Sequence, residues 1–283
     1  MDRIYPAIKF APQTYCNFGC SSINKTKAKL LDNIVRVGIV SYLNTRPLLF
    51  GIEHSGIRPQ IELIQDYPAK IAGKLLEGSI DIGLIPVAVI PSLKEKHIVT
   101  NYCIGCDGPV ASVCLFSEVP LEEVEEVLLD YQSRTSVALA KLLLKEYWKI
   151  NPRLIDTRSE YQDQIKGSTA GLLIGDRALA QRKVSPFIYD LGEAWINHTR
   201  LPFVFAAWVS NKKLSDEFLS DFNEANKYGV DHLKEVIATT RSEVFDLKKY
   251  YTSHISYSLD GKKREGLELF LEKIKNPAKD PIF

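Results

Sequence analysis

A run of β-branched residues, followed by a polar loop and an apolar helix, is the feature that most constrains the fold of this chain. Residues 35–40, Val-Arg-Val-Gly-Ile-Val, predict a short buried strand. The apolar spacing of residues 48–52 predicts a helix, with Thr45 as its N-cap and Pro47 in its first turn. The polar residues 41–45 then form a strand-to-helix loop, which is where ligands bind in open α/β sheets. An ordinary connecting loop is the alternative.

The alternation of strand and helix continues along the chain. Further strands are predicted at residues 61–64, 80–86, 99–103, 110–116, 127–129, 154–155, 170–174, 187–191 and 201–209. Further helices are predicted at residues 71–76, 137–148, 161–166, 177–183, 218–225, 230–237 and 267–274. Strands separated by helices pair in parallel, so the chain belongs to the α/β class.

Two such series, between which the chain crosses twice, predict a two-lobed periplasmic-binding-protein-like (type II) fold with an interlobe cleft. We expect residues 35–117 and 203–283 to form the first lobe and residues 118–202 the second. The cleft between the lobes is the expected ligand site. Residues 1–34 show no clean periodicity, and we expect them to be a poorly ordered N-terminal extension.

Charge and hydropathy exclude several classes of function. The formal net charge is +1, and the basic residues form no stripe interleaved with aromatic residues, so we expect no nucleic-acid partner. No apolar run is long enough to span a membrane, and the N-terminus lacks the pattern of a secretory signal. We therefore expect a cytoplasmic protein that does not bind membranes.

The cysteines predict neither disulfides nor a metal site. An odd number of cysteines without a secretory signal argues against a disulfide framework. Cys103 and Cys106 have metal-ligand spacing, but the other pair, Cys16 and Cys20, lies in the N-terminal segment. Buried thiols are the expected state of these residues, and no metal is expected.

Four loops would face the cleft: residues 41–45, residues 83–88, residues 109–113 with Ser112, and residues 133–136. The last of them begins a helix, whose free N–H groups and dipole favour an anion. The hydroxyl groups of Thr135 and Ser136 add hydrogen-bond donors, so a carboxylate ligand is expected. The alternative is that Ser133 or Thr135 only caps the helix.

Familiar catalytic motifs are absent from the sequence. It contains no phosphate loop, no dinucleotide glycine fingerprint and no nucleophile elbow. Its five histidines form no metal-spaced pair, and surface or core roles are expected for them. His198 is the histidine most suggestive of a site, because it lies in a predicted cleft loop. Asp176 is most simply a helix cap.

Six motifs in order resemble the chorismate dehydratase family of the futalosine route to menaquinone. They are Ser41-Tyr42-Leu43-Asn44-Thr45-Arg46-Pro47-Leu48 and the segments at residues 108–113, 133–136, 175–179, 190–195 and 201–208. The resemblance covers about residues 35–274 and leaves residues 1–33 outside.

This resemblance implies a two-lobed binding-protein fold and a reaction that uses no cofactor or metal. The reaction removes water from chorismate, a small-molecule substrate, to give 3-[(1-carboxyvinyl)oxy]benzoate, and the enolpyruvyl carboxylate of the substrate takes the proton. Asn44 and Ser112 match the family's important Asn and cleft Ser, which implies catalytic roles. The substrate-binding residues implied are Ser41, Tyr42, Thr45, Arg46, Ser133, Thr135, Ser136 and Asp176.

Two other functions stay open at this point. Dihydroxynaphthoate synthase, a sister enzyme of the same pathway, shares the fold but has a different opening loop and uses a catalytic His. A non-catalytic solute-binding protein for a carboxylate ligand is the second alternative. The sequence leaves the oligomeric state open.

Overall fold

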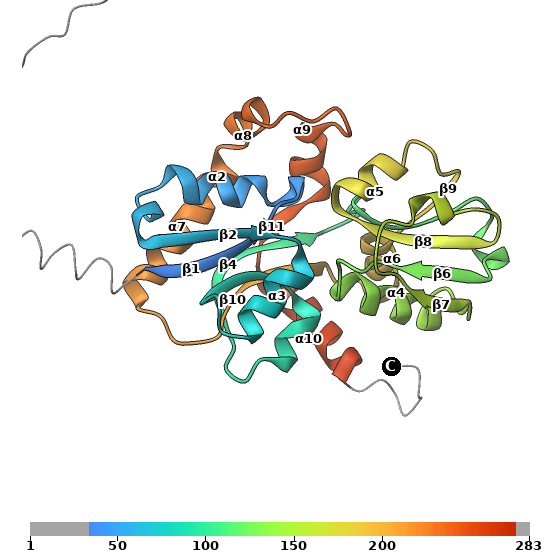
Figure 1. The fold of residues 1–283 in the computed structure, drawn as a ribbon, viewed down its shortest axis with the longest axis horizontal. Helices are drawn as coiled ribbons and strands as arrows, with labels where there is room; N and C mark the ends of the chain where they lie inside the picture. The colour runs from blue at the N-terminus through green and yellow to red at the C-terminus, as the bar shows by residue number, and fades with distance from the viewer. Residues whose placement is uncertain (1–33, 276–283) are drawn as a thin grey trace, which may run out of the picture. The chain divides into compact units, whose positions relative to one another are not determined.

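The computed structural model describes residues 34–275 (Figure 1). The chain from Val35 onward forms one compact unit. The predicted N-terminal extension lies outside the described residues except for Ile34, and so do Cys16 and Cys20. None of the helices in the described part is long and apolar enough to cross a membrane.

The first sheet has six strands and mixes parallel and antiparallel pairs. Its order is β11 (Ser256–Ser258), β4 (His97–Cys106), β10 (Phe203–Ser210), β3 (Ile82–Pro86), β1 (Val35–Val40) and β2 (Ile61–Asp66). Strand β1 lies parallel to both β2 and β3, as strands joined by helices should. Strand β10 runs antiparallel between β3 and β4, so the return of the chain completes this sheet.

The second sheet has five strands. Its order is β7 (Arg153–Asp156), β6 (Glu126–Leu129), β8 (Thr169–Ile174), β5 (Val113–Ser117) and β9 (Phe187–Asp190). Strand β5 pairs antiparallel with β8 and β9. We expected residues 113–117 in the first lobe; their pairing instead puts the crossing between the sheets at residues 107–112. The remaining lobe boundaries stay predictions.

Helices pack on both faces of each sheet. In the first sheet, α2 (Arg46–His54) and α7 (Asp216–Asp231) lie opposite α3 (Pro68–Leu76) and α10 (Gly261–Lys275) in Figure 1. The second sheet carries α4 (Thr135–Glu146), α5 (Gly175–Gln181) and α6 (Leu191–Thr199). Shorter elements connect them: η1 (Leu43–Thr45), η2 (Arg58–Gln60), η3 (Val87–Ser92), η4 (Leu121–Glu123), η5 (Gln162–Gln164), α8 (Leu233–Thr239), α9 (Leu247–Lys249) and the π-helical turn η6 (Tyr250–His254).

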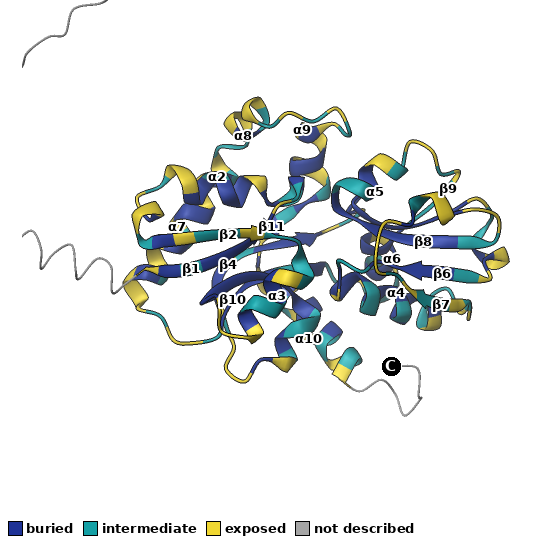
Figure 2. Ribbon diagram, in the orientation of Figure 1, coloured by how far each residue is buried: buried dark blue, intermediate teal, exposed yellow. Residues whose placement is uncertain are grey.

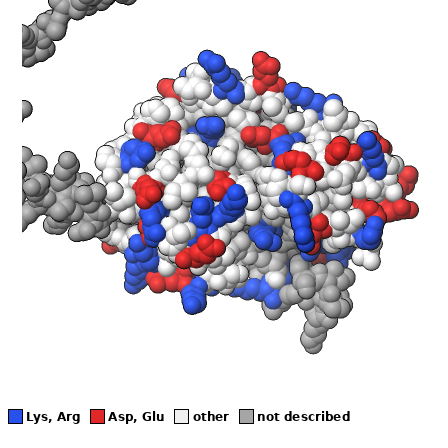
Figure 3. Space-filling view, in the orientation of Figure 1, with Lys and Arg blue, Asp and Glu red and all other residues white. Residues whose placement is uncertain are grey.

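Burial follows this layered arrangement. Strands β3 and β5 are buried along their whole length, because helices cover both faces of the sheets (Figure 2). Most charged side chains lie on the outside, and Figure 3 shows that acidic and basic residues are mixed on the visible face.

Helix α6 is the main element that the sequence analysis missed. We expected a loop around His198, but the Asp190 carboxylate accepts hydrogen bonds from the N–H groups of Gly192 and Glu193 and caps a helix there. Thr45 makes no cap of the predicted kind, because its side chain makes no cap bond to α2.

Two glycines allow helices α2 and α7 to cross at backbone contact. A Cβ atom on Gly51 would lie 1.9 Å from the Ala225 carbonyl oxygen, and one on Gly229 would lie 1.8 Å from the Pro47 carbonyl oxygen. Helix α2 follows η1, the turn that contains Asn44, so this crossing also sets the position of the first predicted site loop.

We predict that Gly229→Ala destabilises the protein by about 3 kcal/mol, because a methyl group has no room against a backbone carbonyl. The melting temperature should then fall by roughly 10 °C. Gly73→Ala is the matched control: it lies in α3, a Cβ there meets nothing within 4 Å, and the alanine should stabilise the helix slightly. Equal melting temperatures for the two variants would contradict the close crossing.

Candidate functional site

Loops from both sheets surround a cleft with about 520 Å³ of space between its atoms, a figure that includes open solvent. The lining residues are Val40, Tyr42, Asn44, Thr45, Pro68, Leu84, Pro86, Ile104, Val110, Ser112, Val113, Ser133, Thr135, Ser136, Ile174, Gly175, Phe205 and Ala206. None of these lining residues carries a charged side chain. Apolar groups and neutral hydrogen-bonding groups make up the wall that the described residues form.

The loop that carries Asn44 is held by its own backbone. The Thr45 hydroxyl lies 2.6 Å from the Val40 carbonyl oxygen and 2.8 Å from that of Tyr42, so it fixes the loop. The Tyr257 hydroxyl donates to the Asn44 backbone carbonyl at 2.9 Å. The side-chain Oδ1 of Asn44 is buried and has no hydrogen-bond partner among the described residues. This acceptor is therefore available to a ligand.

Ser112 lies on the turn by which the chain crosses between the sheets. Its side chain is completely buried, and its carbonyl oxygen accepts from the Gly175 N–H at 2.8 Å. The preceding residue, Ala111, has a φ of 63°, which is unusual for a residue with a Cβ atom. The turn thus places Ser112 in the cleft through a disfavoured backbone conformation.

The start of α4 brings three hydroxyl groups to the cleft. Ser133 Oγ accepts from the Ser136 N–H at 3.0 Å. Ser133 therefore caps the helix, which was the alternative to ligand binding in the sequence analysis. Thr135 Oγ1 accepts from the Ala88 N–H at 3.1 Å and so contacts the segment after β3. Since Thr135 Oγ1 accepts this bond, its own proton can be donated to a ligand.

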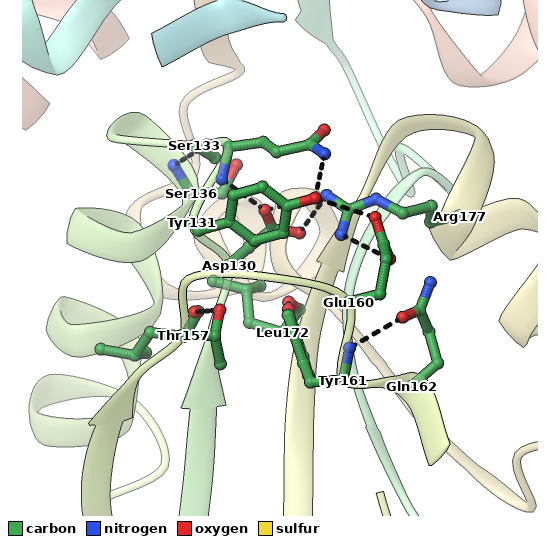
Figure 4. Close-up of polar contacts among 12 residues, drawn as sticks. Asp130, Tyr131, Ser133, Ser136, Thr157, Glu160, Tyr161, Gln162, Leu172 and Arg177 are labelled. Atoms are coloured by element: carbon green, nitrogen blue, oxygen red, sulfur yellow. Dashed lines mark hydrogen bonds and ion pairs between the residues drawn. The ribbon is translucent and has the colours of Figure 1, made fainter. Parts of the chain in front are cut away.

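A buried ion pair holds the loop before α4 in place (Figure 4). Arg177 Nη2 donates to both carboxylate oxygens of Asp130, at 2.9 and 2.8 Å, and Arg177 Nη1 lies 3.5 Å from Glu160 Oε2. Asp130 also accepts from the Gln132 N–H at 2.8 Å. Burial raises the pKa of Asp130 although Arg177 opposes this, while Asp130 raises the pKa of Arg177 against the effect of burial.

Three contacts join the Asn44 loop to the second sheet. The Tyr42 hydroxyl donates to Gln132 Oε1, and the Leu43 N–H donates to Asp176 Oδ1 at 3.0 Å. The Tyr42 ring also packs on Gly175, which has a φ of 60°; a Cβ there would lie 2.9 Å from the ring. Burial raises the pKa of Tyr42, so its hydroxyl stays neutral and can donate.

The structure brings together seven of the ten predicted site residues. They are Tyr42, Asn44, Thr45, Ser112, Ser133, Thr135 and Ser136. The other three are outside the lining. Ser41 is exposed, Arg46 lines a separate surface hollow with Arg241, and the Asp176 carboxylate is bound to the Leu43 N–H. His198 also lies outside, on α6, where it faces Glu146 at 3.3 Å.

The sequence analysis missed the apolar wall and the polar supports. Leu84, Ile104 and Phe205 line the cleft from strands that were predicted only as buried core. Gln132 and Arg177 lay within or beside the motifs, but their roles depend on partners distant in sequence. No local pattern indicates such pairs.

The two cysteines with metal-ligand spacing are core residues. Cys103 and Cys106 are both fully buried, and burial raises the pKa of Cys103 to about 12. Metal ligation requires the thiolate, which this environment disfavours. Among residues 34–275, no group of three or more His, Cys, Asp or Glu side chains is arranged to hold a metal ion.

Two sequence comparisons relate the chain to known proteins. A sequence model of the family described as menaquinone biosynthesis matches residues 35–276. A chorismate dehydratase from Thermus thermophilus is 29% identical over 266 residues, which cover 85% of this chain and 95% of that enzyme.

Solved structures resemble the chain in fold. A protein from Archaeoglobus fulgidus superposes with a TM-score of 0.67 at 13% identity, over 87% of this chain and 98% of its own. A Candida albicans protein described as having the generic periplasmic-binding-protein fold gives a TM-score of 0.58 at 12% identity, over 88% of this chain and 92% of its own. The predicted binding-protein-like fold is confirmed. Because the family match covers nearly all the described residues, the chain belongs to the menaquinone biosynthesis family.

Proposed function

We propose that this protein is an enzyme, a hydro-lyase that converts chorismate to 3-[(1-carboxyvinyl)oxy]benzoate and water in menaquinone biosynthesis. One observation carries the proposal: the chain matches a chorismate dehydratase along 95% of that enzyme's length. The matched region includes the cleft and its hydroxyl and amide groups.

The cleft suits a substrate with two carboxylates. The N-terminus of α4 and the hydroxyl groups of Thr135 and Ser136 offer neutral donors and the positive end of a helix dipole to one carboxylate. The apolar wall of Leu84, Ile104 and Phe205 suits the ring. Burial strengthens such hydrogen bonds, because little water competes for the donors.

The reaction breaks the C3–H and C4–O bonds of the substrate. The electron pair of the C3–H bond forms the new ring double bond, hydroxide leaves from C4, and the transferred proton completes the water. Tyr42 is the one titratable side chain among the described lining residues, and its raised pKa keeps it protonated. The resemblance to chorismate dehydratases implies that the enolpyruvyl carboxylate of the substrate takes the proton, and aromatisation drives the reaction.

In this mechanism the protein mainly orients the substrate. The unpaired Oδ1 of Asn44 would accept a hydrogen bond from the C4 hydroxyl of the substrate, and Ser112 also lines the cleft. The Asn44 NH₂ group and the Ser112 hydroxyl would donate to the enolpyruvyl carboxylate and hold it near the C3 proton. Tyr42, Thr135 and Ser136 complete the binding surface.

The direct test is incubation of the purified full chain with chorismate, followed by mass spectrometry and ultraviolet absorption. We expect a product that has lost one water and gained an aromatic spectrum. A solute-binding protein would leave chorismate unchanged, and so would a dihydroxynaphthoate synthase. Unchanged chorismate would thus reject the proposal.

Asn44→Ala should reduce the turnover number by about a hundredfold, because loss of the orienting contact misplaces the reacting groups. Its backbone carbonyl, bound by Tyr257, is unaffected, so the variant should stay folded. Asn44→Asp should bind chorismate more weakly, since it puts a carboxylate beside an anion. The exposed Asn197→Ala on α6 is the control, and circular dichroism checks folding. Turnover near the wild-type rate in folded Asn44→Ala would remove Asn44 from the mechanism.

Ser136→Ala should mainly weaken substrate binding. Loss of a hydrogen bond to a carboxylate costs about 1.5–3 kcal/mol, which corresponds to roughly a 10- to 150-fold weaker apparent affinity. Ser136 is a cleaner test than Thr135, whose oxygen also accepts from the Ala88 N–H. The exposed Ser79→Ala is the matched hydroxyl deletion outside the cleft. If both variants bind chorismate equally well in a calorimetric titration, Ser136 does not contact the substrate.

A further inference from the structure

The turn that presents Ser112 is held by a carboxylate from another part of the chain. Asp190, at the end of β9, is 8% exposed. Its Oδ2 accepts from the Ala111 N–H at 2.7 Å, and its Oδ1 accepts from the Val110 N–H at 3.0 Å. Two consecutive N–H groups of the turn therefore point at one carboxylate.

The same turn is restrained from its carbonyl side. The Ala111 carbonyl oxygen lies 3.4 Å from Arg182 Nη1 and 3.4 Å from Cys114 Sγ. Ala111 is completely buried and has a φ of 63°. A residue with a Cβ atom keeps this conformation only when its surroundings impose it.

Both oxygens of Asp190 bind the turn, but only Oδ1 also serves helix α6. Oδ1 also accepts from the N–H groups of Gly192 and Glu193, at 3.0 and 3.1 Å, and so caps α6. One oxygen would be enough for that cap. Oδ2 instead bonds the Ala111 N–H, the residue whose backbone is strained.

We propose that Asp190 is a positioning residue: through Oδ2 it holds Ala111 in the left-handed conformation that places Ser112 in the cleft. The activity readout of this inference rests on the proposed chorismate dehydratase function. Asp190 does not line the cleft, so its effect on turnover passes through the turn. Strained backbone that its surroundings hold in place is a known device for fixing reactive groups.

Asp190→Asn tests this directly. The asparagine carbonyl can replace Oδ1 and keep the helix cap, while its NH₂ group would face the Ala111 N–H and lose that bond. We expect the turnover number for chorismate to fall by about a hundredfold, as small misplacements of reacting groups do, with a much smaller change in KM. Hydrogen exchange should become faster at the Ala111 amide and stay slow at Gly192 and Glu193.

Ala111→Gly in the Asp190→Asn background is the rescue variant. Glycine adopts a positive φ without a steric cost, so it should restore about tenfold of the lost turnover. Ser215→Ala, which removes the cap of α7 away from the cleft, controls for the loss of a helix cap.

Each outcome decides the inference. Wild-type turnover in folded Asp190→Asn, or a slow variant that glycine does not rescue, would overturn it. If Asp190→Asn does not fold, recovery of folding in the double variant supports the inference, and failure to recover overturns it. If the wild-type protein does not dehydrate chorismate, the proposed function fails. The role of Asp190 is then decided by whether Asp190→Asn speeds hydrogen exchange at the Ala111 amide and leaves Gly192 and Glu193 slow.

Discussion

The cleft depends on the buried ion pair between Asp130 and Arg177. Asp130 is completely buried, and a carboxylate in that position needs a charged, hydrogen-bonded partner. The bidentate contact with Arg177 supplies one and joins the loop before α4 to helix α5. Removal of either partner from such a pair typically costs about 3–5 kcal/mol, because the other charge stays buried and unpaired. The hydroxyl groups at the start of α4 and the Gly175 turn are thus fixed relative to each other.

The described wall of the cleft carries no charge, although the proposed substrate is an anion. Asp130 and Arg177 are not among the lining residues, and their opposite charges offset each other. Recognition of the proposed substrate then depends on directional donors: a helix N-terminus and serine and threonine hydroxyls. Such donors fix the orientation of a carboxylate, whereas a flexible lysine would supply mainly a point charge. This arrangement fits chemistry that depends on the orientation of the substrate.

Local signals in the sequence predicted the strands except β11, most helices and the loops of the cleft. The segment 35–52 has β-branched residues, polar residues and a helical apolar face in succession, so the Asn44 loop was predictable from neighbouring residues. The strand Val113–Ser117 was predicted, but its sheet was not, because pairing with β8 and β9 is non-local. Helix α6 was missed because its cap, Asp190, fell inside the predicted strand 187–191 and the residues after it were interpreted as a loop. Two contacts support the site: Asp190 binds the Ala111 N–H, and Arg177 binds Asp130. Each joins residues that lie far apart in the sequence, so no local pattern predicts it.

The glycine crossing between α2 and α7 limits how this sequence can diverge. A clash between two side chains can usually be relieved by a second substitution that makes the partner smaller. Gly51 and Gly229 each face main-chain atoms of the other helix, and no substitution makes main-chain atoms smaller. Neither position therefore has a compensating partner, and a change at either one must move α2 itself. Since α2 follows the turn that contains Asn44, such a movement would carry the Asn44 loop with it.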